Sequence, residues 1–524
     1  MNIIRRILKW TGTTLVALLL VPFILIALLY IPPIQNWAVQ KAVGVASEAT
    51  GMTITLERVG ISFPLDIELK NLTACQEGDT LLHTGSVVVD MDFSQIFHGQ
   101  LGVEGIDIRE GIFNSADLIP QMHIGGQLGQ LHLDREDTDL TQGKAILSGA
   151  SLKDCHLDIS MRDTTIVDTT ESSPLPWSIR VGRIDISNTS IGLRMPGDTM
   201  TVNTEIRKAF VSDGDIRLEE STYTIGALGI DIDTLHLCMM DTAGTKTCMP
   251  LSATSLGVDS LRLDSAAVAL QQFHISTATT DGERKSLISG NLQMDFNAFT
   301  PKSKGAFSTS IKASLAHSDL LDIAKDILPK DLAKAYPTLP LNAHIAANGN
   351  IDSISIDTLH LSMPTAMDIH AHGYIADALA ENGMKANLLW DISTMNLDFM
   401  RRYLGLEGVN IPRMNLSAET KIQGSTYGAD AQLSCGKGKV RAKASIDLDN
   451  MQYRARVHAD QLDIRNFLPQ DSIGLLSFYA KASGHGTDPL SRATGLKAEV
   501  DLKHLEYKDW NMDNARFTAK LRRG

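Results

Sequence analysis

A long uncharged stretch near the N-terminus limits what this chain can fold into. No charged residue lies between Lys9 and Lys41, and residues 10–31 are almost entirely apolar. A helix of about 20 such residues crosses the hydrocarbon core of a bilayer. The basic residues before the stretch place residues 1–9 in the cytoplasm by the positive-inside rule. We therefore expect a single transmembrane helix over residues 10–31, with the remainder of the chain exported.

A cleaved signal peptide is the alternative interpretation of this stretch. Its apolar core typically spans about 7–15 residues and ends at a small-residue cleavage site. The stretch in this chain is longer and ends in Tyr30-Ile31-Pro32-Pro33, which lacks such a site. An uncleaved anchor is the interpretation we adopt. Residues 32–50 follow as a short amphipathic linker.

The exported part, residues 51–524, is predicted to be an elongated all-β region. In residues 63–70 and 86–94, apolar side chains alternate with polar ones, as in strands with one dry face and one wet face. The alternation slips near Gly105, which indicates a β-bulge. A string of separate β-sandwich domains is the alternative, but no long Pro/Ser/Gly-rich linker separates such domains. The pair Gly125-Gly126 is interpreted as a turn, with a hinge or an opening as the alternative.

Repeated segments also favour an elongated array of strands. Residues 232–239 (IDTLHLCM) and 356–363 (IDTLHLSM) differ at one position. Short helices that end at a breaker are predicted at residues 319–329, 397–405 and 462–469. Such recurrence is typical of folds built by adding one unit after another.

Composition and motifs exclude several functions. The net charge of −13 and the lack of a basic run after the anchor argue against nucleic acid. The five cysteines are scattered, so we interpret them as small apolar residues and keep a Cys238–Cys248 bridge as the alternative.

No enzymatic motif is found, so we expect no catalytic residue and no cofactor. We expect no metal site either: His370 and His372 share a strand face, but no third ligand follows from the sequence. Residues 435–439 (CGKGK) lack the spacing of a phosphate-binding loop and are interpreted as the start of a hairpin.

Several consecutive segments resemble the N-terminal part of the AsmA-like superfamily, and TamB-type translocation and assembly proteins fit best. After the anchor come residues 61–71 (ISFPLDIELKN), 78–82 (GDTLL) and 99–114 (GQLGVEGIDIREGIFN), with a short hydrophobic helix expected at residues 94–97. The resemblance is strong over residues 1–115 and looser beyond. TamB-type chains are usually longer and finish in a C-terminal domain that is not recognised here, so a fragment, a truncated product and a short paralogue all remain open.

The resemblance implies a curled antiparallel sheet, or taco, with an apolar concave face. It implies a single-pass protein of the inner membrane whose bulk lies in the periplasm. Phospholipid transport to the outer membrane and outer-membrane biogenesis would be its function. Its partners would be phospholipid acyl chains and an outer-membrane β-barrel protein. The alternative is a scaffold for the assembly of outer-membrane β-barrel proteins or for protein secretion. The alternating strands give the predicted groove lining: Phe63, Leu65, Ile67, Leu69, Val87, Val89, Met91 and Phe93.

Overall fold

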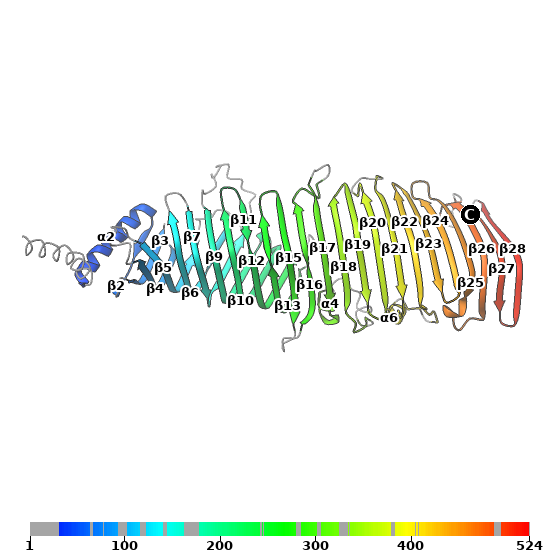
Figure 1. The fold of residues 1–524 in the computed structure, drawn as a ribbon, viewed down its shortest axis with the longest axis horizontal. Helices are drawn as coiled ribbons and strands as arrows, with labels where there is room; N and C mark the ends of the chain where they lie inside the picture. The colour runs from blue at the N-terminus through cyan, green and yellow to red at the C-terminus, as the bar shows by residue number, and fades with distance from the viewer. Residues whose placement is uncertain are drawn as a thin grey trace, which may run out of the picture. The chain divides into compact units, whose positions relative to one another are not determined.

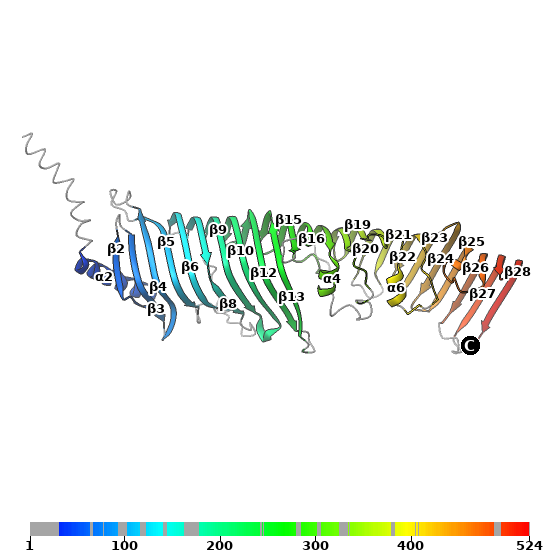
Figure 2. The same cartoon turned by 90° about the horizontal axis from the view of Figure 1, so that it is seen from below.

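The fold is dominated by long antiparallel strands (Figures 1 and 2). The computed structural model describes residues 31–524, except 63–65, 77, 93–101, 116–121, 140–143, 162–177, 241–243, 245, 279–283, 301–304, 324–333, 335, 379–382, 404, 407, 487–493 and 523–524. The chain divides into two units, Met1–Ser255 and Leu256–Gly524. The predicted all-β class is confirmed.

The N-terminal prediction falls largely outside the described part. Residues 1–30 lie there, together with Phe63, Leu65, Phe93 and the helix expected at residues 94–97. Among the helices that the structure describes, none combines the length and the hydropathy that a membrane span requires. The predicted linker at residues 32–50 is helix α2 (Pro32–Thr50), which has a proline in its first turn and ends at Gly51 in the left-handed conformation. Both features are usual at helix ends.

Unit 1 is built around one curled sheet. Its strands are β1 (Thr53–Thr55), β2 (Arg58–Ser62), β3 (Asp66–Gln76), β4 (Asp79–Asp92), β5 (Gly102–Asn114), β6 (Met122–Asp139), β7 (Lys144–Lys153), β8 (His156–Met161), β9 (Ser178–Arg194), β10 (Met200–Arg217), β11 (Thr222–Ile225) and β12 (Ala227–Met240), with the 3-10 turn η1 (Pro196–Asp198). Strand β13 (Lys246–Val258) runs across the boundary between the units. Neighbours pair antiparallel, except that β7 and β8 each pair parallel with β9.

Unit 2, taken by itself, is an antiparallel meander. Its strands are β14 (Ser260–Leu263), β15 (Ala267–Ala278), β16 (Arg284–Asp295), β17 (Phe307–Leu315), β18 (Leu341–Asn350), β19 (Ser353–Met363), β20 (Met367–Ala376), β21 (Lys385–Thr394), β22 (Met414–Gln423), β23 (Thr426–Cys435), β24 (Gly438–Asp447), β25 (Gln452–Asp463), β26 (Ile473–His485), β27 (Gly495–Tyr507) and β28 (Trp510–Arg522). From β14 onward each strand pairs with the next one along the chain.

The short helices of unit 2 lie at the ends of strands. Helices α4 (His317–Ile323) and α6 (Asp398–Tyr403) are found where two short helices were predicted. Phe399 of α6 packs on Met363 and Ala366 at the β19–β20 turn. In α4, Asp319 accepts a hydrogen bond from Ser286 Oγ at 2.6 Å, at the end of the β15–β16 hairpin. The third predicted helix, at residues 462–469, is instead the 3-10 turn η2 (Ile464–Asn466).

Two glycine predictions have different outcomes. The register of β4 and β5 shifts between Asp90 and Met91, opposite Gly105 and Val103, so the predicted bulge is confirmed. The turn predicted at Gly125-Gly126 is wrong because both glycines lie inside β6. A Cβ atom on Gly126 would come within 2.0 Å of the His156 carbonyl oxygen, so this glycine permits close approach of β8.

Candidate functional site

Strand register in unit 1 collects apolar side chains into two adjacent rows on one face, which we call the apolar face of unit 1. Residues that pair directly across a sheet share a face. The first row is Val59, Leu69, Val87, Ile108, Leu131, Leu152, Ile186, Ala209 and Ile230. The second row is Ile61, Ile67, Val89, Ile106, Leu133, Ala150, Ile184, Val211 and Leu228. Neither row contains a polar residue.

Four of the predicted groove-lining residues lie in these two rows. Ile67 pairs with Val89, and Leu69 pairs with Val87. Met91 follows the bulge on the same strand, pairs with Val103, and is half-buried. Phe63, Leu65 and Phe93 lie outside the described residues. The structure thus brings Ile67, Leu69, Val87 and Val89 together on one face, and their role as a lipid-contacting lining stays a prediction.

Unit 2 carries an apolar face of the same kind, again with two adjacent rows. One row is Phe273, Gly290, Ile311, Ile345, Leu359, Ala371, Trp390, Ala418, Ala431, Ala442, Val457, Ala480, Val500 and Phe517. The other is Ile275, Ile288, Ala313, Ala343, Leu361, Ile369, Ile392, Leu416, Leu433, Val440, Ala459, Phe478, Leu502 and Ala515. We call these residues the apolar face of unit 2. The sequence prediction had named groove residues only in unit 1.

Most side chains of both apolar faces remain partly open to solvent. In the rows of unit 2, only Ala371, Ala459 and Leu502 are buried, while Ile345 is 39% exposed. In the rows of unit 1, only Val59, Val87 and Ala209 are buried. A core between two packed layers would instead bury nearly all such residues. Within the described part of each unit, the apolar face is therefore not closed by a second layer.

The apolar face of unit 2 has a hollow over strands β22–β25. Ile422, Tyr427, Ile446 and Tyr453 pair in succession along one side of it. A neighbouring row of small side chains also lines the hollow: Ala429, Ala444 and Ala455. Small residues next to tyrosines leave room for an elongated apolar ligand, and the charged residues Lys421 and Arg454 also contribute to the lining.

The opposite face of each sheet is polar. In unit 1 it carries ion pairs such as Arg183–Asp185 (2.8 Å), and His132 lies between Asp107 and Asp134 at 3.2 and 2.9 Å. Partial burial opposes the charge on His132, but the two carboxylates outweigh burial and raise its pKa. In unit 2 the same kind of face carries a row of five histidines among other polar residues: His274, Ser289, Lys312, His344, His360, His370, Asp391, Ser417, Gln432, Arg441 and His458.

The segment at residues 435–439 forms the predicted hairpin. Cys435 ends β23 and pairs with Gly438, the first residue of β24. Gly436, in the left-handed conformation, makes the turn. The alternation of wet and dry positions resumes directly after it in β24.

No known protein family matches this chain, and no curated protein matches it either. The resemblance to AsmA-like proteins thus rests on the residues quoted above.

Proposed function

We propose that this chain is an inner-membrane-anchored periplasmic protein that carries phospholipid acyl chains on its apolar faces towards the outer membrane. The observation that carries the proposal is the open apolar face of each unit. An apolar face that water contacts is costly, and an acyl chain laid on it recovers about 0.8 kcal/mol for each buried CH₂ group. The headgroup of the lipid stays in water beyond the edge of the sheet.

The disulfide between Cys238 and Cys248 supports the compartment in this proposal. Disulfides persist in oxidising compartments such as the bacterial periplasm and are rare in the cytosol. A periplasmic location agrees with the sequence prediction of an N-terminal anchor followed by an exported β region. The outer-membrane partner would be a β-barrel protein, as the resemblance implies.

Site-specific photo-crosslinking in cells tests the proposal. A photoreactive amino acid replaces Ile345, which is exposed on the apolar face of unit 2. The matched control replaces Asn348 of the same strand, an exposed residue on the opposite face that donates a hydrogen bond to Asp357 Oδ2 at 2.6 Å. We expect lipid adducts, identified by mass spectrometry, at residue 345 and few at residue 348.

Two outcomes would contradict the proposal. Equal lipid labelling at both positions would mean that the apolar face has no special role. Adducts to outer-membrane protein precursors at residue 345, without lipid, would favour the scaffold instead, because the apolar face would then contact a client protein.

A further inference from the structure

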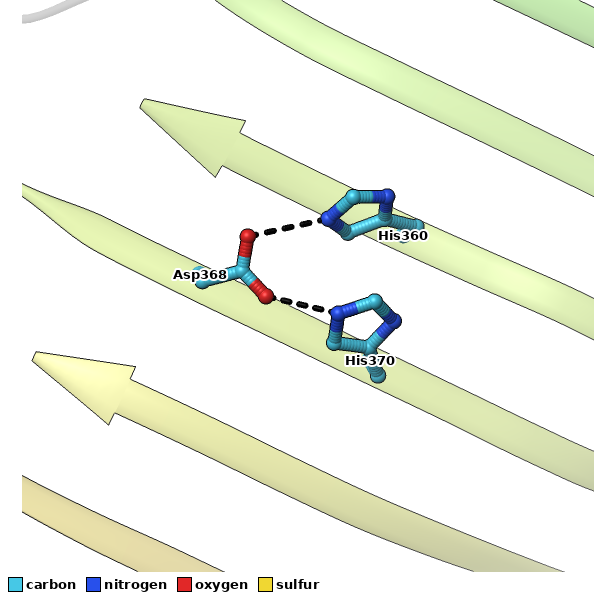
Figure 3. A group of neighbouring side chains, drawn as sticks. All are labelled: His360, Asp368 and His370. Carbon is cyan, nitrogen blue, oxygen red and sulfur yellow. Dashed lines mark hydrogen bonds and ion pairs between the residues drawn. The ribbon is translucent and has the colours of Figure 1, made fainter. Parts of the chain in front are cut away.

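Three potential metal ligands meet on the polar face of unit 2. His360 of β19 pairs directly with His370 of β20. Their rings stack with centroids 4.0 Å apart and an interplanar angle of 12°. Asp368 lies two residues before His370 on the same strand. Figure 3 shows that the two imidazoles present their Nε2 atoms to different oxygens of this one carboxylate.

The geometry of this cluster is close to that of a metal site. The Nε2 atom of His360 lies 3.0 Å from Asp368 Oδ2, and that of His370 lies 2.6 Å from Asp368 Oδ1. The three ligand atoms all lie within 4.8 Å of one another. A tetrahedral ion with bonds of about 2.0–2.1 Å needs ligand atoms roughly 3.4 Å apart, so small side-chain rotations suffice. The side chains are 33%, 35% and 53% exposed for His360, Asp368 and His370, so an ion can enter from solvent.

The donor set indicates which ion would bind. Two imidazole nitrogens and one carboxylate oxygen suit Zn²⁺ and similar divalent transition metals better than Mg²⁺ or Ca²⁺, which prefer oxygen ligands. The residues beside the cluster in the same row have partners of their own. His344 lies 3.4 Å from Ser310 Oγ, and Asp391 accepts a hydrogen bond from Ser417 at 2.6 Å. Three protein ligands would therefore leave the remaining position to water.

We propose that His360, Asp368 and His370 bind a divalent transition metal ion, with Zn²⁺ as the reference ion. The ion joins β19 to β20 on the polar face, away from the apolar face. This proposal differs from the expectation of no metal site, which no observation tests: the sequence offered only His370 with His372, whereas the structure gives His370 a partner from the neighbouring strand. Among the described residues the first IDTLHL repeat shows no such group, and its His236 pairs with Asn203 of β10.

Calorimetric titration of the full chain in detergent with Zn²⁺ tests the proposal. We expect His360→Gln and His370→Gln each to weaken binding at least tenfold, as loss of a ligand should. Glutamine keeps a hydrogen-bond donor for the carboxylate of Asp368, so these variants should retain the hydrogen bonds that the cluster makes without a metal ion. His372→Ala and His236→Ala are the controls and should change the affinity less than twofold.

A second measurement separates binding from misfolding. Zn²⁺ should raise the unfolding temperature of the wild type and of both controls, but not that of His360→Gln or His370→Gln. Circular dichroism of the metal-free variants should match that of the wild type. Absence of Zn²⁺ binding to the wild type up to millimolar concentration would overturn the proposal. Binding that survives both glutamine substitutions would overturn it as well.

Discussion

Cys238 of β12 is joined to Cys248 of β13 by a disulfide, and their Cα atoms are 4.0 Å apart. The interpretation of these two cysteines as small apolar residues is therefore wrong, and the alternative bridge is correct. The spacing of the cysteines along the sequence does not show which of them are joined. Cys238 and Cys248 come together because β12 and β13 are neighbouring strands. Cys75, Cys155 and Cys435 remain free thiols.

Removal of this bridge should destabilise the chain. In the chain-entropy model, a bridge that closes a loop of this length lowers the entropy of the unfolded chain and so raises the free energy of unfolding by about 2–3 kcal/mol. We expect Cys238→Ala/Cys248→Ala to lower the free energy of unfolding by that amount in urea denaturation. Cys155→Ala is the control for loss of a thiol. If the protein isolated from cells alkylates at both Cys238 and Cys248 without reductant, the bridge is absent.

Gly373 should resist substitution, because its backbone has φ +148° and lies against a neighbouring strand. A Cβ atom there would come 2.0 Å from the carbonyl oxygen of Asn387. We expect Gly373→Ala to cost about 1–3 kcal/mol in the free energy of unfolding. Gly428→Ala is the control, since the nearest atom to its Cβ would be 3.8 Å away. Equal stability of the two variants would contradict the positions of β20 and β21.

The ionised carboxylate of Asp90 should lower the free energy of unfolding at neutral pH, and substitution by asparagine should remove this effect. Partial burial, followed by repulsion from Asp66 and Asp107, raises the pKa of Asp90. The free energy of unfolding therefore falls as pH rises from 3.8, the pKa of this carboxyl in the unfolded chain, through its higher pKa in the folded protein. We expect Asp90→Asn to be more stable than the wild type at pH 7, by about 0.3 kcal/mol as for a screened surface charge pair.

Urea midpoints at pH 7 and pH 3 measure this difference. It should disappear at pH 3, where Asp90 is protonated in both states. A stabilisation of equal size at both pH values would point to a steric cause, such as the approach of Asp90 to Gly105, instead of charge.

The sequence predicted the strands better than their partners. Alternation along residues 86–94 placed Val87 and Val89 on one face, because that property is local to each strand. It could not show that Val89 pairs with Ile106, or that His360 pairs with His370, because register depends on turns and bulges elsewhere. The same limit explains the wrong turn prediction at Gly125-Gly126. Only the position of β8 beside β6 shows that Gly126 permits a close approach of two strands.

Glu499 should contribute stability that is lost in acid. Hydrogen bonds from Lys481 (2.7 Å) and Lys497 (2.8 Å) lower the pKa of Glu499 to about 2. Its stabilising effect is therefore complete above the unfolded value of 4.5 and declines as pH falls towards 2. We expect Glu499→Gln to be less stable than the wild type at pH 6 and to approach it near pH 2. A difference that persists at pH 2 would contradict the pairing. The effect should be small, because the carboxylate is exposed.

Charge substitutions on the two faces of β4 distinguish an open apolar face from an ordinary closed core. Val89 lies in the second row of the apolar face of unit 1 and is half-buried. Its neighbour Val88 points to the opposite face, where it pairs with Glu68 and Asp107. Lysine at position 88 gains two acidic neighbours, so Val88→Lys is the matched control.

We expect Val89→Lys to keep the β spectrum in circular dichroism and to lose most of the co-purifying phospholipid measured by mass spectrometry. On an open face, a long lysine side chain reaches water while its stem covers apolar neighbours. It then places a charge where acyl chains would lie. Val88→Lys should retain both the fold and the lipid. If the face were instead closed, Val89→Lys would bury an unpaired charge and unfold unit 1, which would contradict the open face.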